Sequence, residues 1–270
     1  MIHAGEIQTI AAKFAVRDTQ IEKDYVISWV LHGISDNEFL VNHLVFKGGT
    51  VLKKAFFPDY RFSEDMDFTF TFGDFDINKI KNAFEALIKW IYEESRIKLA
   101  IQDETQHETG NYNFYLSYIG SLGGKGENKS IKVDISCDEL IYYPVEKRVI
   151  INAYSDLTSE FSVQCYSIEE SAAEKMRSLM QRTAPRDLYD LWYLFEVERM
   201  NIEDCIYGFR EKTFYKKINP RGLVKTIFLK EKIFSKLWTD HLNYQVQELP
   251  EFKNVWRALG KHWRKLERFQ

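Results

Sequence analysis

The sequence predicts an α+β fold, in which a mixed β-sheet flanked by helices is followed by a helical bundle. Three observations predict it. Between residues 65 and 137, several segments alternate apolar and polar residues with a period of two, which is typical of half-buried strands. Helical spacing of apolar residues precedes and separates these segments. From residue 167 helical spacing continues almost to the end, so we expect a first domain over residues 1–165 and a helical domain over 166–270.

The first part of the chain is expected to lead from a helix into a short strand and a second helix. Apolar residues recur at helical spacing over 21–34, with charged residues on the other side. An apolar run at 43–46 then reaches the segment Gly48-Gly49-Thr50. We expect Thr50 to cap a helix that ends near Phe56.

The expected sheet continues after this helix. At 65–70 apolar side chains face one way and acidic ones the other, which predicts a strand. Residues 77–99 predict a helix, and 112–119 and 131–137 predict two more strands. The Gly-rich segment 120–130 most simply joins those two as an antiparallel pair, and it lacks the Gly-Lys-Ser/Thr ending of a phosphate-binding P-loop.

The helical domain opens with a capping signal. Ser167 and Glu170 form a Ser-x-x-Glu capping box that starts a helix ending near Gln181. Thr183 and Pro185 open the next helix, whose apolar residues continue at helical spacing.

Composition excludes several classes of protein. The 270 residues are 45% hydrophobic, which is enough to build a core, and 13 Gly and 5 Pro exclude a collagen-like or low-complexity chain. No apolar run approaches the ~20 residues that span a bilayer, and the N-terminus lacks the pattern of a signal peptide. Three cysteines with wide spacing fit no zinc motif. We expect a reduced, soluble, cytoplasmic protein that does not enter a membrane.

Charge is distributed unevenly along the chain. The net charge is −3, but residues 1–204 carry −12 and residues 205–270 carry +9. A basic C-terminal region suits contact with a polyanion, and chance clustering on a solvated surface is the alternative.

The strand at 65–70 and its neighbour present a candidate metal site. Asp65 and Asp67 are two residues apart and share a strand face, and Asp134 lies on the polar face of a second strand. Carboxylate oxygens are ligands that Mg²⁺ prefers, and a two-metal site of this kind catalyses phosphoryl displacement. The alternative is a polar sheet face that only meets solvent.

The segment Gly48-Gly49-Thr50 is a candidate phosphate site. Two glycines at the start of a helix let backbone N–H groups approach phosphates, and the helix dipole favours the anion. A plain strand-to-helix turn is the alternative reading.

Three charged residues of the helical domain are also candidates. Lys175 falls on the apolar arc of its helix, so it either extends out to solvent or enters a cleft that holds an anion. Asp187 and Asp190 are three residues apart on one helix face, where they suit either a catalytic role or, for Asp187, an interaction with the helix dipole.

Five motifs follow one another along the chain: Phe46-Lys-Gly-Gly-Thr-Val-Leu-Lys53, Arg61-Phe-Ser-Glu-Asp-Met-Asp67, Val133-Asp-Ile135, Ala173-Glu-Lys-Met-Arg-Ser-Leu179 and Pro185-Arg-Asp-Leu-Tyr-Asp-Leu191. Their order resembles that in the AbiEii/AbiGii-type nucleotidyltransferase toxins of the DNA polymerase β-like superfamily. The early segment Ile21-Glu-Lys-Asp-Tyr25 also resembles the opening helix of that family, and the resemblance covers roughly residues 20–195. In one departure, fifteen residues separate Gly49 from Asp65, more than the superfamily's usual gap.

The resemblance implies a nucleotidyltransferase-like sheet with an added helical bundle, acting as the toxin of a toxin–antitoxin or abortive-infection system. It implies Mg²⁺, a nucleoside triphosphate, an RNA acceptor such as the 3′ end of a tRNA, and a cognate antitoxin. It also implies site residues. Metal would be held by Asp65 and Asp67, with Asp134 as a third ligand, and Lys175 with Asp187 or Asp190 would complete the catalytic site. The nucleotide would be bound by Gly48, Gly49, Thr50, Lys53, Arg61, Ser63 and Lys175.

The C-terminal segment predicts an amphipathic helix with a basic stripe. Its apolar residues from Phe252 to Leu266 recur at helical spacing. The basic residues on the other side span about 16 Å at 1.5 Å per residue, a reach that matches several RNA phosphates. We interpret the stripe as a surface for the acceptor RNA, with a solvated helix face as the alternative. Its members are Arg257, Lys261, Arg264, Lys265 and Arg268.

Two other functions are compatible with parts of this sequence. Asp65-Met-Asp-Phe-Thr69 matches the start of haloacid-dehalogenase phosphotransferases, whose first aspartate ends a buried parallel strand. A nucleotide-binding or protein-binding module without turnover is the second alternative, and a test for labelled nucleotide in RNA separates it from an enzyme.

Overall fold

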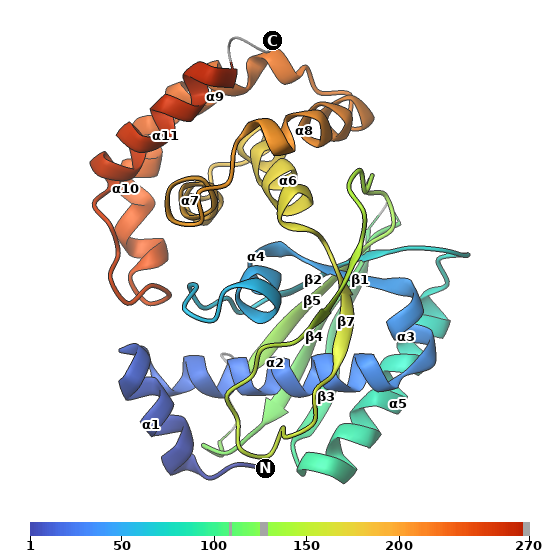
Figure 1. Ribbon diagram of the computed structural model, residues 1–270. Helices are drawn as coiled ribbons and strands as arrows, with labels where there is room; N and C mark the ends of the chain where they lie inside the picture. Colours follow the sequence, from blue (N-terminus) through green and yellow to red (C-terminus); the bar gives the residue numbers. More distant parts are fainter. Residues whose placement is uncertain (108–109, 125–128, 267–270) are drawn as a thin grey trace. The chain divides into compact units, whose positions relative to one another are not determined.

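The chain folds into two compact units. The computed structural model describes residues 1–107, 110–124 and 129–266 (Figure 1). The first unit consists of Met1–Glu139 and Val145–Cys165. The second consists of Leu140–Pro144 and Tyr166–Gln270, so a short segment within the sequence of the first unit belongs to the second.

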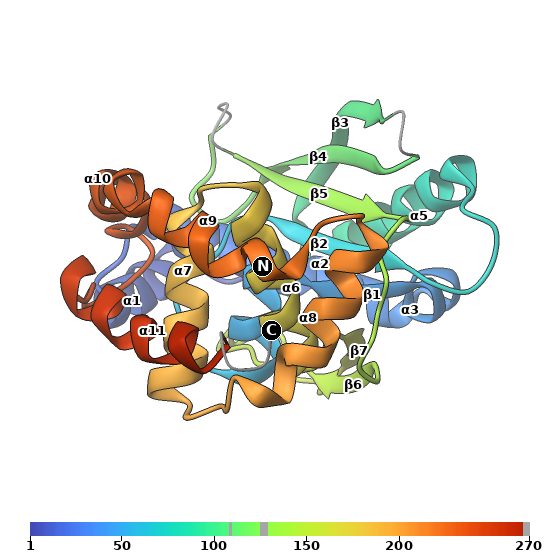
Figure 2. The same cartoon turned by 90° about the horizontal axis from the view of Figure 1, so that it is seen from above.

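A seven-stranded mixed sheet forms the centre of the first unit. Its strand order is β3-β4-β5-β2-β1-β7-β6, which can be followed in Figure 2. Strand β1 pairs antiparallel with β2 and parallel with β7, and β2 pairs parallel with β5. This confirms the predicted mixed sheet with flanking helices. The strands are β1 Leu44–Lys47, β2 Met66–Phe70, β3 Lys98–Gln106, β4 Tyr112–Ile119, β5 Ser130–Ser136, β6 Glu146–Val149 and β7 Ser162–Cys165.

The sheet has an apolar face and a polar face, as the alternation in β2, β4 and β5 predicts. On the apolar face the ring of Phe84 from α5 (Ile77–Ser95) packs 4.9 Å from the ring of Phe114. Helix α2 (Asp18–Asp36) lies beside α5, with the Trp29 and Trp90 rings 6.2 Å apart. The remaining helices of this unit are α1 Ala4–Phe14, α3 Glu38–His43, α4 Gly48–Val51 and η1 Leu52–Phe56.

Strand pairing places charged residues next to one another on the polar face. Asp67 is the register partner of Lys47 in β1 and of Asp134 in β5. Because register partners point to the same side of a sheet, these three side chains share one face.

Three sequence predictions for this unit are wrong in detail. The helix predicted over 77–99 ends at Ser95, because Arg96 adopts a left-handed conformation with φ of +65°, and the chain continues as the edge strand β3. Thr50 does not cap the helix after β1: the helix begins at Gly48 with Lys47 at its N-cap, and Thr50 lies inside its first turn. Strands β3, β6 and β7 are not predicted by the alternation pattern, because β3 is largely exposed and the other two have four residues each.

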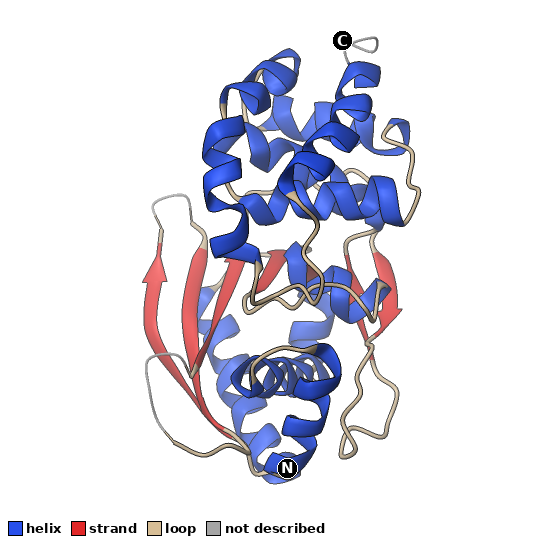
Figure 3. Cartoon of the chain, turned by 90° about the vertical axis from the view of Figure 1, so that its left-hand side faces the viewer, coloured by secondary structure: helices blue, strands red, loops and turns tan. Residues whose placement is uncertain are grey.

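The second unit is built from helices and loops, and its described residues contain no strand (Figure 3). None of the helices in the described part of the chain is both long and apolar enough to span a membrane. The helices are α6 Ile168–Gln181, α7 Pro185–Trp192, η2 Tyr193–Val197, α8 Glu203–Tyr215, η3 Pro220–Gly222, α9 Leu223–Leu229, α10 Glu231–Leu242 and α11 Phe252–Leu266.

The predicted cap of α6 forms, but its glutamate has a different role. The Ser167 hydroxyl accepts the Glu170 N–H at 3.1 Å. The fully buried Glu170 carboxylate accepts the N–H groups of Tyr142 and Tyr143 at 3.0 and 2.8 Å and pairs with Lys212 at 2.5 Å. These contacts tie Leu140–Pro144 into the second unit.

Candidate active site

The site in the first unit is centred on the glycine that follows β1. Gly48 has a φ of +81°, a backbone conformation that L side chains rarely adopt. A Cβ atom at this position would lie 2.1 Å from Oδ2 of Asp67. The Asp67 carboxylate therefore lies directly against the Gly48 backbone, and both the space and the conformation require glycine here.

The second glycine lies against a different pair of polar side chains. A Cβ atom at Gly49 would lie 2.6 Å from Nη2 of Arg61 and 3.5 Å from Oγ of Ser63. The Thr50 hydroxyl donates to the backbone carbonyl of Asp65 at 2.5 Å. The segment from Arg61 to Asp65 is thereby folded over the start of the helix, despite the long gap in sequence.

This arrangement fits a divalent cation bound together with a phosphorylated substrate. Asp65 and Asp67 are both half-buried; the Asp67 carboxylate lies next to Gly48 on the polar side of the sheet, and Asp65 directly precedes β2. Mg²⁺ in nucleotide enzymes is commonly held by one or two carboxylates plus substrate phosphates, without a complete cage of protein ligands. Among the described residues no group of three Asp, Glu, His or Cys side chains is placed to hold a metal ion. Asp65 and Asp67 therefore fit a site in which one or two carboxylates and the substrate phosphates together hold the ion.

Asp134, the third expected ligand, has a salt bridge of its own. Its carboxylate pairs with the Lys132 ammonium at 2.6 Å, two residues away on the same strand face. Asp134 remains the register partner of Asp67, so it lies next to the site, with part of its charge balanced by Lys132.

Lys47 is a neighbour of the site that sequence reasoning missed. It is buried, and its ammonium donates to the Ser136 hydroxyl at 3.3 Å across the polar face. The available signal was its place directly before Gly48, as the one charged residue at the end of an apolar run.

Lys53, an expected nucleotide ligand, holds a loop. Its buried ammonium donates to the carbonyls of Pro58 and Tyr60 at 2.9 and 3.0 Å and lies 4.0 Å from the centre of the Phe62 ring. Burial lowers the pKa of Lys53 to about 8. Lys53 thus fastens the loop whose next residues include Arg61.

A buried charge cluster behind the site was also missed. The Lys54 ammonium, which is 2% exposed, pairs with Asp24 of α2 and donates to the Ser28 hydroxyl at 2.9 Å. The Tyr154 hydroxyl donates to the same Asp24 carboxylate at 2.6 Å. The cluster anchors η1 to α2, and a charged residue amid the apolar positions of 21–34 was its only sequence signal.

In the second unit the structure brings together three predicted residues. The ammonium of Lys175 lies 3.0 Å from Oδ1 of Asp187 and 2.8 Å from Oδ2 of Asp190. Arg182, which was not predicted, donates through Nε and Nη2 to the two Asp187 oxygens at 2.7 and 2.9 Å. Lys175 does not extend to solvent, and both aspartates are fully buried.

Electrostatics of this cluster favour ionised carboxylates. Burial opposes ionisation of Asp187, but the charges of Lys175 and Arg182 outweigh it and hold the pKa of Asp187 below its usual value. The cluster is therefore a fixed set of charges that largely balance within the protein.

The basic stripe of α11 forms in the part that the structure describes. Arg257, Lys261, Arg264 and Lys265 are exposed, whereas the opposite apolar side chains of the helix are buried. Arg268 lies outside the described residues.

Comparison with known proteins gives one family and several solved structures. The family model described as "Nucleotidyl transferase AbiEii toxin, Type IV TA system" matches residues 29–261. JHP933 from Helicobacter pylori is similar at 16% identity and a TM-score of 0.60, over 94% of each chain. MenT4, a nucleotidyltransferase toxin from Mycobacterium tuberculosis, is similar at 16% identity and a TM-score of 0.54, over 97% of this chain and 99% of that one. No curated protein matches the sequence.

Proposed function

We propose a reaction for this chain from the premise that it belongs to the AbiEii family of nucleotidyl transferase toxins of type IV toxin–antitoxin systems. The chain is accordingly a nucleotidyltransferase, and its family implies a nucleoside triphosphate substrate and an antitoxin partner. The proposed reaction transfers a nucleoside monophosphate from the triphosphate to the 3′-hydroxyl of an RNA, with tRNA among the candidate acceptors. The observation that carries the proposal is the contact of Asp67 with Gly48 and of Arg61 and Ser63 with Gly49.

The two glycines and the residues against them suit binding of the triphosphate. Backbone N–H groups at the start of the α4–η1 helix are available to phosphate oxygens, and no side chain of Gly48 or Gly49 stands in their way. The Arg61 guanidinium adds a planar, permanently charged donor at Gly49, and Ser63 adds a hydroxyl. The Thr50 hydroxyl keeps the carboxylate-bearing segment against this cradle.

Asp65 and Asp67 would hold Mg²⁺, with Asp134 beside them as a third candidate ligand. When bound, Mg²⁺ activates the attacking hydroxyl and neutralises charge on the leaving pyrophosphate. In the proposed transfer the acceptor hydroxyl oxygen bonds to the α-phosphorus in line, and the bond from that phosphorus to the β-phosphate oxygen breaks. Asp67 sets the position of the transfer, because its carboxylate contacts the backbone of Gly48, which in this proposal binds the phosphates.

The second unit would supply further contacts to the substrates. By resemblance Lys175 contacts phosphates, and Asp187 and Asp190 would hold its ammonium in a defined position. The exposed stripe of Arg257, Lys261 and its neighbours on α11 would bind the acceptor RNA. The proposal places the protein in the cytoplasm, where RNA and nucleoside triphosphates both occur.

The haloacid-dehalogenase alternative does not agree with the structure. Its nucleophilic aspartate ends a parallel strand, whereas Asp65 stands just before the first residue of β2. Strand β2 also continues for five residues after that point. Family membership excludes the alternative independently.

The direct test is incorporation of label into RNA. The purified protein is incubated with total RNA, Mg²⁺ and each of the four α-labelled triphosphates in turn, and labelled 3′ ends are then sequenced. We expect label from one or a few triphosphates in a defined set of RNA ends, and none with Asp67→Ala or with a chelator present. Nucleotide that is retained on the protein without labelled RNA would identify a binding module and refute the proposed reaction.

A further inference from the structure

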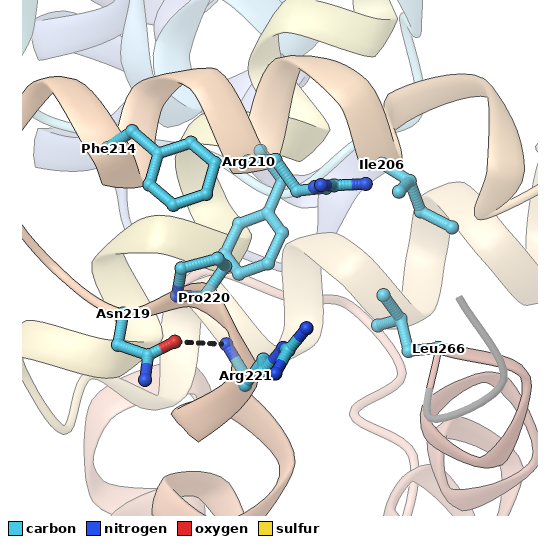
Figure 4. Close-up of a pocket in the computed structure, with 8 residues that line it drawn as sticks. Ile206, Arg210, Phe214, Asn219, Pro220, Arg221 and Leu266 are labelled. Atoms are coloured by element: carbon cyan, nitrogen blue, oxygen red, sulfur yellow. Dashed lines mark hydrogen bonds between the residues drawn. The ribbon is translucent and has the colours of Figure 1, made fainter. Parts of the chain in front are cut away.

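A cavity in the second unit is lined by none of the proposed site residues. It has a volume of about 320 Å³ and opens between α8, η3 and the last residue of α11 (Figure 4). This volume is at the lower end of the range for ligand pockets. It is lined by Ile206, Phe209, Arg210, Phe214, Asn219, Pro220, Arg221 and Leu266.

Two arginines stand on different sides of this cavity. Figure 4 shows Arg210 on the α8 side, and Arg221 across from it on η3. Both side chains are exposed, and within the described residues neither guanidinium forms an ion pair. The backbone N–H of Arg221 donates to Oδ1 of Asn219 at 3.1 Å, which fixes the turn from which this arginine projects. Two exposed guanidiniums around one cavity indicate an anionic ligand, because Arg binds phosphate and carboxylate through paired N–H donors.

Apolar surfaces lie between the two arginines. The Phe209 ring is buried in the wall of the cavity, whereas Phe214 is 53% exposed at its margin. Ile206 and Leu266 close the opposite side (Figure 4). An exposed aromatic ring beside arginines is a usual platform for an unpaired base, since every base has a flat face that can stack.

We propose that this cavity binds one nucleotide of a single-stranded nucleic acid, with the base stacked on Phe214 and the adjoining phosphates on Arg210 and Arg221. An acidic peptide would satisfy the arginines equally well, but it would not use the exposed ring. The charges of the surrounding chain favour the nucleic acid, because all the lining residues belong to the segment 205–270, whose net charge is +9. If the strand is the acceptor RNA, this assignment rests on the proposed function. Binding itself does not depend on transfer.

The test measures binding with the full chain and no triphosphate. Fluorescein-labelled ten-nucleotide strands of RNA and of DNA are titrated at several salt concentrations. The double variant Arg210→Gln/Arg221→Gln is compared with Lys232→Gln/Lys236→Gln, which removes two exposed charges of α10 outside the cavity. Phe214→Ala tests stacking, and because the ring is exposed, its removal should leave the fold intact.

We expect Phe214→Ala to weaken binding about 5- to 150-fold, the range for loss of one stacked base. The arginine double variant should lower the salt slope by up to about 0.7 for each lost phosphate contact. The control variant Lys232→Gln/Lys236→Gln should change the binding affinity and the salt slope less. Binding of either RNA or DNA through these residues supports the proposal, and preference for RNA would identify the acceptor type of strand.

Three outcomes would overturn it: wild-type affinity in the arginine variant, a loss no larger than that of the lysine control, or equal competition by an acidic peptide of the same length. Failure of the proposed function is distinguishable. A protein that transfers no label but binds strands through Arg210 and Arg221 retains the cavity assignment. If the protein transfers label but the arginine double variant binds strands as the wild type does, only the cavity assignment is refuted.

Discussion

The two aspartate clusters of this chain differ in how deeply their carboxylates are buried. In the first unit Asp65 and Asp67 are half-buried, and Asp67 rests against the bare backbone of Gly48. In the second unit Asp187 and Asp190 are fully buried around the ammonium of Lys175. A partly solvated pair next to an open backbone is suited to bind a cation that arrives with substrate. A buried pair with a resident ammonium is suited to keep its own geometry.

The difference shows why spacing alone does not separate a proposed active site from a buried charge cluster. Two aspartates at i and i+2 on a strand, or at i and i+3 on a helix, both present neighbouring carboxylates. What distinguishes the two is burial, because Asp65 and Asp67 are half-buried whereas Asp187 and Asp190 are fully buried around Lys175. We therefore expect substitutions in the first cluster to affect chemistry and those in the second to affect stability first.

Removal of Asp67 should have the largest effect on activity. Asp67→Ala deletes a proposed metal ligand, and loss of several kcal/mol of charge stabilisation corresponds to about 10³-fold or more in transfer rate. Because the side chain is half-buried, the free energy of unfolding should fall by no more than about 1 kcal/mol. Single-turnover incorporation of label and urea denaturation measure the two quantities. Full activity in this variant would remove Asp67 from the site.

Removal of Lys175 should have the largest effect on stability. Lys175→Met fits the apolar arc of α6, but it leaves Asp187 and Asp190 buried without their ammonium. Breaking a buried pair costs about 3–5 kcal/mol, or roughly 6–20 °C in melting temperature for a chain of this size. Lys236→Met, at an exposed position of α10, is the matched control and should change little. If Lys175→Met melts like the control, the second cluster does not stabilise the fold and the comparison fails.

Substitution of Gly48 by alanine tests whether the contact between this glycine and the Asp67 carboxylate matters for the reaction. Gly48→Ala places a Cβ against a carboxylate oxygen that must move, and it adds the cost of a left-handed alanine, about 1–2 kcal/mol. Gly124 has a similar φ of +77°, and a Cβ there would meet no atom within 4 Å, so Gly124→Ala carries the strain alone. Gly48→Ala should lose at least as much stability as Gly124→Ala, measured by thermal melts, and only Gly48→Ala should lose most of its transfer activity. Equal activity in the two variants would show that the Asp67 contact has no part in the reaction.

The smallest expected effect is a change in acid stability. The pKa of Asp187 is lower in the folded protein than in an unfolded chain, so its stabilisation is complete above about pH 4 and is lost as the pH falls through the folded value. Asp187→Asn removes this dependence, and its melting temperature should fall less steeply below pH 4 than that of the wild type. Identical slopes in thermal melts from pH 5 to pH 3 would mean that Asp187 is not held ionised by its neighbours.

Local patterns in the sequence predict the parts of the fold and site that depend on near neighbours in the chain. The alternation around Asp67 identifies β2, and Ser167 identifies the start of α6. Lys175, Asp187 and Asp190 were each identified from helical spacing, although their pairing was not. These features need only the periodicity of one element or of two adjacent ones.

The rest depends on contacts between distant segments, for which one sequence carries little signal. Arg182 was not separable from any other basic residue until the turn after α6 brought it to Asp187. Likewise, Lys54 and Asp24 are thirty residues apart, and only packing of η1 on α2 joins them. Strand β3 escaped prediction because its exposed half consists of polar residues that favour loops as readily as strands.

The membership of Leu140–Pro144 in the second unit has a consequence for how this protein could be divided. A fragment that ends at residue 165 would retain the segment but lose the Glu170 carboxylate that accepts its N–H groups. A fragment that starts at residue 166 would keep Glu170 but lose those donors, and Lys212 would lose the carbonyl of Leu140. Each half would expose a broken hydrogen-bond network, so neither fragment is expected to be stable when the chain is cut at residue 165.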